Sequence, residues 1–262
     1  MYIRFSVIVV CYNAGDKLRD TIDSILEQTY EEYEIIIKDA MSTDRSLEKI
    51  PLNDKIKMIS CKDQGIYDGM NQAVGHATGA YYIFLNCGDS FYNRDVLDHT
   101  AQLIKDRDSL IYYGDTFNEY AQSIVTMNSK ITPFTCYRHI PCHQACFYAA
   151  ELFQERRYDL HYKIRADYEH FLWSYFCKNA NPRHLGLIVA NYEGGGFSET
   201  KENEALDRQE HREITEKYMT ESQLRKYRLF MIVTLMPIRK YLSRTKWFSG
   251  IYNGIKQMIY GE

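Results

Sequence analysis

The sequence predicts an α/β protein with a Rossmann-like, mostly parallel central sheet, helices on both faces of the sheet and a C-terminal helical extension. Two observations indicate this class. Four short apolar segments, at 5–10, 33–38, 56–60 and 81–85, each end in polar or acidic residues, and stretches with helical periodicity lie between them. Strands that alternate with helices form βαβ units, which build a parallel sheet.

The first βαβ unit occupies the N-terminus. Residues 5–10 are continuously apolar, which is typical of a strand buried on both faces. Over 18–26 the apolar residues recur at helical spacing, and the next apolar run, 33–38, stops at Asp39.

Two further strands complete the parallel half. A short strand is expected at 56–60, followed by a helix near 66–77 that Gly79 ends as a C-cap. The aromatic run 81–85 then stops at Asn-Cys-Gly-Asp, ending at Asp89. Polar groups at the carboxyl ends of parallel strands are where α/β proteins bind ligands.

The second half is predicted to add shorter elements, some of them antiparallel. Helices are expected at 96–104, 167–176 and 205–227. Strands are expected at 110–113, 123–127, 147–148 and 187–192. The segment 132–146, rich in Pro, Cys and His, is expected to be an irregular loop over the site.

The composition limits the classes of function. A chain of 262 residues has room for one large α/β domain and an appendage. A net charge of −3 does not favour a nucleic-acid partner. Seven cysteines without a signal-peptide pattern indicate reduced thiols and a cytoplasmic location. No run of 18 apolar residues predicts a transmembrane helix.

The C-terminal end differs from the rest of the chain. From 222 to 261 there are eight Lys or Arg and no Asp or Glu. We therefore divide the chain into a domain at 1–222 and a basic amphipathic helical extension at 223–262. The extension could be packed core, a homodimer contact or a membrane-surface helix. Its basic character and aromatic residues favour an anionic membrane surface, and a peripheral position on the inner face of the cell membrane.

Three carboxylates stand at positions where ligands bind. Asp39 and Asp89 follow predicted strands, and Asp167 lies at a loop-to-helix junction. The glycine-rich loop that cradles phosphates is absent after the first strand. A bound diphosphate would therefore need a metal as its counter-charge, and carboxylates suit Mg²⁺ or Mn²⁺.

Four segments together resemble the ordered signature of family 2 glycosyltransferases, the inverting nucleotide-sugar transferases with the GT-A fold. These segments are 7–13, 35–44, 63–71 and 79–89. The resemblance covers residues 5 to about 200. The segment 63–71 is similar to a subgroup found among bacterial polysaccharide and lipopolysaccharide enzymes.

The resemblance implies a nucleotide site. Tyr12 and Asn13 match residues that line the base pocket, and Asp39 matches an aspartate that accepts a hydrogen bond from the base, commonly uracil. Asp68 and Asn71 lie three residues apart on one helical face. We predict that they contact the nucleotide sugar, with a solvated helix face as the alternative.

The resemblance also implies a reaction centre. Asp89 matches the last aspartate of the metal motif, in which Asn86 and Gly88 stand where the family often has carboxylates. Asp167 matches the proposed catalytic base. His143 and Gln144 match a His-Gln pair of the subgroup, and with Asn86 they are predicted to line the acceptor or donor sugar.

Each of these assignments has an alternative. Glu169 and Asp159 are rival bases, and Asp167 could instead cap the helix that follows it. Zinc binding by the Cys and His residues of 136–146 is disfavoured, because only one pair has ligand-like spacing.

The sequence therefore predicts a metal-dependent inverting glycosyltransferase. Its partners would be a nucleotide-sugar donor, most often a UDP-sugar, and a glycan or lipid-linked acceptor in cell-surface polysaccharide synthesis. The alternatives are another nucleotide-diphosphate enzyme, such as a nucleotidyltransferase, and a catalytically degenerate sugar-binding or scaffold protein.

Overall fold

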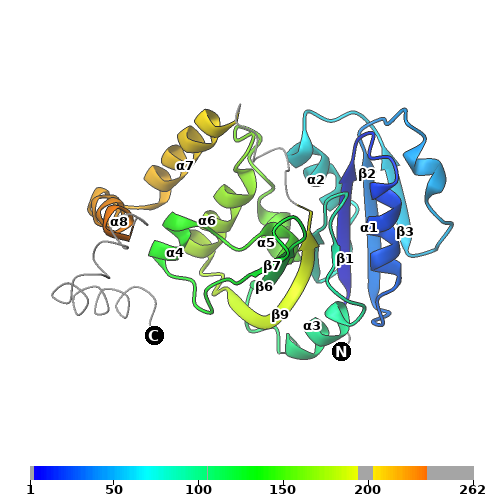
Figure 1. Ribbon diagram of the computed structural model, residues 1–262, viewed down its shortest axis with the longest axis horizontal. Coiled ribbons are helices and arrows are strands. Elements are labelled where there is room, and N and C mark those ends of the chain that lie inside the picture. The colour runs from blue at the N-terminus through cyan, green and yellow to red at the C-terminus, as the bar shows by residue number, and fades with distance from the viewer. Residues whose placement is uncertain (1–2, 105, 194–202, 235–262) are drawn as a thin grey trace.

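A nine-stranded mixed sheet runs through the molecule, with helices on both of its faces (Figure 1). The computed structural model describes residues 3–104, 106–193 and 203–234. Along the sheet the strands follow the order β3-β2-β1-β4-β8-β6-β9-β5, and β7 pairs with β6 outside this path. The predicted α/β class is confirmed.

The N-terminal half of the sheet is parallel throughout. Its strands are β1 (Phe5–Cys11), β2 (Tyr33–Asp39), β3 (Ile56–Ser60) and β4 (Tyr81–Phe84). They are connected by α1 (Lys17–Leu26), the 3₁₀ helix η1 (Ser46–Lys49) and α2 (Ile66–Val74). All four predicted strands are present, and their carboxyl ends meet at one edge, where the ligand site was expected.

The C-terminal half of the sheet is mixed. Its strands are β5 (Ser90–Phe91), β6 (Ile111–Asn118), β7 (Ser123–Val125), β8 (Cys146–Ala149) and β9 (Arg183–Tyr192). Strand β8 is antiparallel to both β4 and β6, whereas β9 is parallel to β6. Its remaining helices are α3 (Val96–Leu103), α4 (Pro133–Arg138), α5 (Ala150–Glu155), α6 (Ala166–Lys178), α7 (Glu204–Tyr218) and α8 (Glu221–Thr234).

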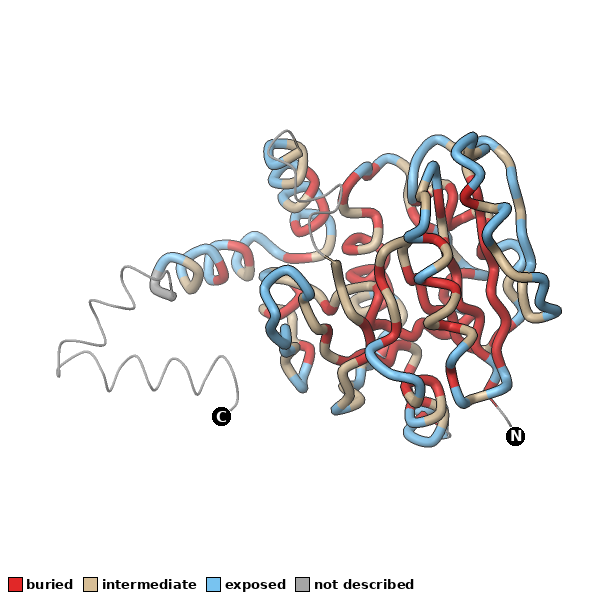
Figure 2. The backbone as a smooth tube through the Cα atoms, turned by 45° about the vertical axis from the view of Figure 1, so that its right-hand side comes forward, coloured by how far each residue is buried: buried red, intermediate tan, exposed pale blue. Residues whose placement is uncertain are grey.

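Alternate residues of the central strands supply two hydrophobic cores, one on each face of the sheet. On β1, Val7 and Val9 belong to the core that α1 and α3 cover, whereas Ile8 belongs to the core under α2, α5 and α6. All three side chains are at most 1% exposed. Figure 2 shows that buried positions are concentrated in the strands at the middle of the molecule. Burial on both faces explains why these strands are continuously apolar.

Two predicted segments differ from the structure. The segment 132–146 is not irregular, because it contains α4 and the 3₁₀ helix η2 (His143–Ala145). Thr132 begins α4 with a capping box to Thr135, a signal that the Pro-rich composition obscured. The predicted helix 205–227 is two helices, since Thr220 accepts a hydrogen bond from the Gln223 N–H and starts α8 afresh.

The predicted boundary at 222/223 falls inside α8. Leu224 and Tyr227 of this helix are buried, and the Tyr227 ring lies 5.3 Å from that of Phe134 in α4. The start of the extension thus packs on the main domain, while 235–262 lie outside the described residues. Within the described chain, no helix is both long and apolar enough to cross a membrane. All seven cysteines are free.

Candidate active site

One cleft of about 300 Å³ is lined by the residues predicted for the reaction centre. We name it the reaction cleft. Its lining includes all five residues predicted for the metal, the base and the sugars: Asn86, Asp89, His143, Gln144 and Asp167. The other lining residues are Ile66, Tyr67, Cys87, Ile140, Pro141, Cys142, Lys163, Ile164, Tyr192 and Glu193. Residues as far apart in sequence as Ile66 and Glu193 thus share one site.

Asp167 lies in the first turn of α6, with hydrogen-bond partners for both carboxylate oxygens. Its Oδ2 is 3.2 Å from Nδ1 of His143, and its Oδ1 is 2.8 Å from the hydroxyl of Tyr67. Burial alone would raise the pKa of Asp167, but the hydrogen bonds from His143 and Tyr67 outweigh it and lower the pKa. The side chain is therefore ionised and able to accept a proton.

His143 connects Asp167 to the end of β4. Its Nε2 lies 3.1 Å from Nδ2 of Asn86. An amide nitrogen only donates, so Nε2 accepts, and Nδ1 carries the proton that is donated to Asp167. The Oδ1 atom of Asn86 is buried and has no partner among the described residues. It can accept a hydrogen bond from a ligand.

Asp89 is the buried carboxylate at the other end of this cluster. It is 5% exposed. Its Oδ2 accepts a hydrogen bond from Nε2 of Gln144 at 2.8 Å, and its Oδ1 accepts one from the N–H of Glu193 at 3.2 Å. Burial raises the pKa of Asp89, and these two hydrogen bonds do not compensate for it. Both donors are uncharged, and Asp89 makes no ion pair with another described residue.

Glu193 occupies the space that a side chain at position 88 would need. Gly88 has φ +97°, and a Cβ there would collide with the Glu193 carboxylate. Nζ of Lys17 lies 2.7 Å from both oxygens of Glu193. The sequence analysis missed Glu193, although its place directly after the last strand is the same signal that identified Asp39 and Asp89.

The Asp89 and Glu193 carboxylates fit a divalent cation. They are close enough for Glu193 to contribute to the raised pKa of Asp89. The described residues include no group of three or more His, Cys, Asp or Glu that could hold a metal. Mg²⁺ is commonly held by one or two protein carboxylates, substrate phosphates and water. The pair therefore suits a metal that arrives with a diphosphate.

A second cavity of about 520 Å³ adjoins the reaction cleft at the carboxyl ends of β1 and β2. This strand-end pocket is lined by Val10, Cys11, Tyr12, Ala40, Asp63, Gly65, Ile66 and Gly69. Tyr12, predicted to line a base pocket, is 66% exposed here and presents a ring for stacking. Ile66 lines both cavities.

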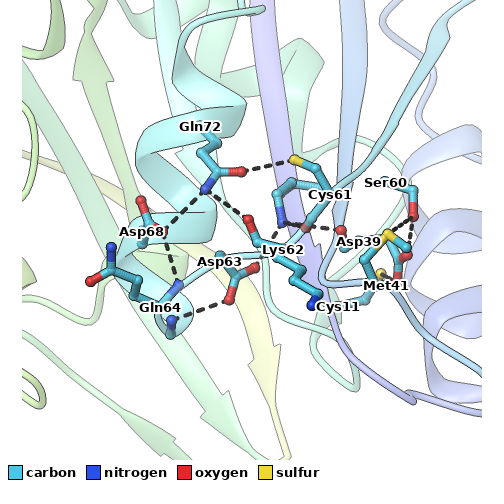
Figure 3. Close-up of polar contacts among 12 residues, drawn as sticks. Cys11, Asp39, Met41, Ser60, Cys61, Lys62, Asp63, Gln64, Asp68 and Gln72 are labelled. Atoms are coloured by element: carbon cyan, nitrogen blue, oxygen red, sulfur yellow. Dashed lines mark hydrogen bonds and ion pairs between the residues drawn. The ribbon is translucent and has the colours of Figure 1, made fainter.

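Asp63 is a pocket residue that the sequence analysis did not single out. Its Oδ2 lies 2.7 Å from Nζ of Lys38, a fully buried lysine at the end of β2, and its Oδ1 accepts the N–H of Gly65 (Figure 3). The sequence did hold a signal for Asp63, because Lys38 stands at the end of the apolar strand 33–38. A buried cation there requires a carboxylate partner.

Asp39 and Asn13 hold the backbone next to the strand-end pocket in place. The Asp39 carboxylate is buried and accepts a hydrogen bond from Oγ of Ser42 at 2.5 Å. It also accepts one from Oγ of Ser60 at 2.6 Å (Figure 3). Oδ1 of Asn13 accepts the N–H of Thr43. Both residues hold the loop after β2, and neither lines the cavity itself. A hydrogen bond from a base to Asp39 would have to replace one from a serine.

Asp68 and Asn71 do not line either cavity, contrary to expectation. Asn71 is 7% exposed, and its amide bonds both the N–H and the carbonyl oxygen of Tyr158 at 2.9 Å. Asp68 accepts hydrogen bonds from the Gln64 N–H and from Gln72 (Figure 3). Both side chains lie on α2 at the predicted helical spacing, but in the structure they form hydrogen bonds to other residues of the chain.

The rival bases lie outside the reaction cleft. Glu169 is fully buried, and its Oε1 is 2.7 Å from Arg156 and 2.8 Å from Lys217. The Asp159 side chain is 38% exposed beside Arg156. Of the three candidates, only Asp167 lines the cleft.

Comparison with known proteins agrees with this geometry. The family model described as glycosyl transferase family 2 matches residues 6–168. A PGL/p-HBAD biosynthesis glycosyltransferase from Mycobacterium bovis is 32% identical over 204 residues, covering 75% of this chain and 79% of that protein.

Solved structures share the fold. S. aureus TarS 1–349 in complex with UDP has a TM-score of 0.68 at 18% identity, over 93% of this chain and 76% of that one. In another TarS structure the match spans 37% of the TarS chain. A mannosyltransferase from Pyrobaculum calidifontis, in complex with GDP-Man and Mn²⁺, has a TM-score of 0.60 at 13% identity, over 100% of this chain and 89% of that one. The GT-A fold is confirmed, and the chain belongs to glycosyltransferase family 2 and is a glycosyltransferase.

Proposed function

We propose that the protein transfers a sugar from a nucleotide-diphosphate donor, a UDP-sugar in the first instance, to a hydroxyl of a lipid-linked or glycan acceptor, with inversion. The observation that carries the proposal is that two carboxylates with different hydrogen-bond partners, Asp89 and Asp167, line one cleft beside the strand-end pocket. The TarS structures, which hold UDP and UDP-GlcNAc, support a UDP donor.

The strand-end pocket would hold the nucleoside. The exposed ring of Tyr12 can stack on a base, and Asp63 can accept a hydrogen bond from base or ribose. Because Ile66 lines both cavities, the diphosphate would extend from this pocket into the reaction cleft.

Asp89 and Glu193 would hold Mg²⁺ or Mn²⁺. When bound, the cation neutralises the charge that develops on the leaving diphosphate. Glu193 would turn from Lys17 toward the metal, which frees the Lys17 ammonium for a phosphate oxygen.

Asp167 would act as the base. The acceptor oxygen attacks the anomeric carbon, the bond from that carbon to the diphosphate breaks, and Asp167 takes the hydroxyl proton. His143 and Tyr67 hold the carboxylate in place. Oδ1 of Asn86 and the amide of Gln144 lie where a sugar hydroxyl could be bound. A single displacement inverts the anomeric centre.

The basic extension would bring the enzyme to its acceptor. We propose that 223–262 docks on the anionic inner face of the cell membrane, where a lipid-linked acceptor would be found. On this proposal 1–222 carries the catalytic domain.

The test uses purified full-length protein with Mn²⁺ and a panel of UDP-, GDP- and dTDP-sugars. Release of nucleoside diphosphate is expected with at least one donor, and NMR of the glycosylated product should show the inverted anomer. Pyrophosphate release from UTP and a sugar 1-phosphate would favour a nucleotidyltransferase. Donor binding without turnover, across all acceptors, would favour a scaffold.

A further inference from the structure

Helices α4, α6, α7 and α8 lie on the side of the molecule away from β1–β3 (Figure 1). Residues of α4, α7 and α8 and of the turn before α6 line a strongly basic cavity. It has a volume of about 380 Å³, and we name it the arginine cavity. The start of α6 and helices α4, α7 and α8 contribute its walls. Its lining residues are Tyr137, Arg138, Arg165, Asp207, Arg208, His211, Arg212, Thr215 and Arg228.

The cavity holds more positive charge than its own carboxylates balance. Five arginines line it against one aspartate, Asp207, which pairs with Arg165 at 2.8 Å. Outside the lining, Glu204 pairs with Arg208 at 3.1 Å and Glu216 pairs with Arg228 at 3.6 Å. Arg212 is exposed and makes no ion pair among the described residues. Clustered guanidinium groups repel one another, and an anion with several oxygens would relieve that repulsion.

Two short segments of the chain contribute residues both to the arginine cavity and to the reaction cleft. Arg165 lines the cavity, while Ile164 and Asp167 line the cleft. Likewise, α4 gives Tyr137 to the cavity, and the turn after it gives Ile140 to the cleft. A molecule anchored in the cavity would therefore lie on the acceptor side, opposite the nucleotide half of the sheet.

Exposed apolar side chains lie beside the arginines. On α8, Leu229 is 58% exposed and Ile232 is 53% exposed. Ile232 is one helical turn beyond Arg228, on the same face of the helix. A basic cavity bordered by exposed apolar side chains suits a ligand with an anionic head and an apolar chain.

We propose that the arginine cavity binds the diphosphate of a lipid-linked acceptor and thereby presents the hydroxyl end of that acceptor to Asp167. This inference rests on the proposed glycosyl transfer and names the class of acceptor. Several arginines around one cavity suit a diphosphate better than the single charge of a phosphodiester headgroup.

Direct binding tests the cavity without any turnover. Full-length protein is titrated calorimetrically with geranyl diphosphate, inorganic pyrophosphate and geraniol. Geranyl diphosphate should bind most tightly. Arg212→Glu should weaken it at least tenfold, as expected for a lost charge-assisted contact. The control Arg225→Glu makes the same change of charge on α8, outside the cavity lining, and should leave affinity within about twofold.

Four results would overturn the proposal: no binding of geranyl diphosphate, equal losses in Arg212→Glu and Arg225→Glu, pyrophosphate binding as tightly as geranyl diphosphate, or Arg212-dependent binding only to phosphatidylglycerol vesicles. Acceptor-free donor hydrolysis separates the two proposals. Its absence from the wild type would count against the proposed transfer and leave the binding result to stand.

Discussion

Asp89, which is buried, and Asp167, which is half-buried, are two carboxylates of one cleft whose pKa values shift in opposite directions. Burial pushes both upward. At Asp167 the hydrogen bonds from His143 and Tyr67 more than offset it, whereas at Asp89 those from Gln144 and the Glu193 N–H do not. The partners, rather than burial, therefore set the two shifts: they keep Asp167 ionised, whereas Asp89 has no ion-pair partner among the described residues.

Replacing the base should give the largest effect. Asp167→Asn keeps the size of the side chain but removes the proton acceptor, so kcat for transfer should fall by about 10²–10⁴. Donor affinity, measured by calorimetry with UDP, should change little. Asp159→Asn is the matched control, because Asp159 is near in sequence yet outside the cleft. Equal kcat in Asp167→Asn and wild type would show that another group is the base.

Replacing the cation ligand should affect metal binding before chemistry. Asp89→Asn should weaken Mn²⁺ binding in the presence of UDP by at least about tenfold, measured by electron paramagnetic resonance of free Mn²⁺. Glu193→Gln should weaken it less, since Glu193 also has Lys17 as a partner. Asp98→Asn is the control, because Asp98 lies on α3 and does not line the reaction cleft. Unchanged Mn²⁺ affinity in Asp89→Asn would mean that the metal, if used, is held elsewhere.

The opposite pKa shifts predict an ordered loss of function as pH falls. The metal-binding form of Asp89 is the ionised one, and it is lost as pH falls through a pKa that lies above the ordinary 3.8. Asp167 stays ionised to a pH below its ordinary 3.8. Mn²⁺ affinity should therefore decline first on acidification, while kcat at saturating Mn²⁺ persists. A coincident decline of both quantities would contradict the comparison.

The sequence predicted the parts of this site that depend on strand ends. Asp89 and Asp167 could be placed because apolar runs and helix starts fix where such residues emerge. Asn71 could not be judged, because helical periodicity gives the face of α2 but not the Tyr158 backbone that meets it. Glu193 was missed although it directly follows the last strand, and only the folded chain shows that it fills the space beside Gly88.

The smallest predicted effect concerns a partner of Asp167. The Tyr67 hydroxyl lies 2.8 Å from Oδ1 of Asp167 and 2.6 Å from the carbonyl oxygen of Ile164, and its one proton serves one acceptor at a time. In Tyr67→Phe the pKa of Asp167 should rise, because a donor that lowers it is gone. The acid limb of kcat should move to higher pH, with kcat on the plateau reduced by about tenfold or less. If the acid limb of kcat does not move, the Tyr67 hydroxyl donates to the Ile164 carbonyl oxygen instead. His143 would then be the side chain that makes the pKa shift of Asp167 opposite to that of Asp89.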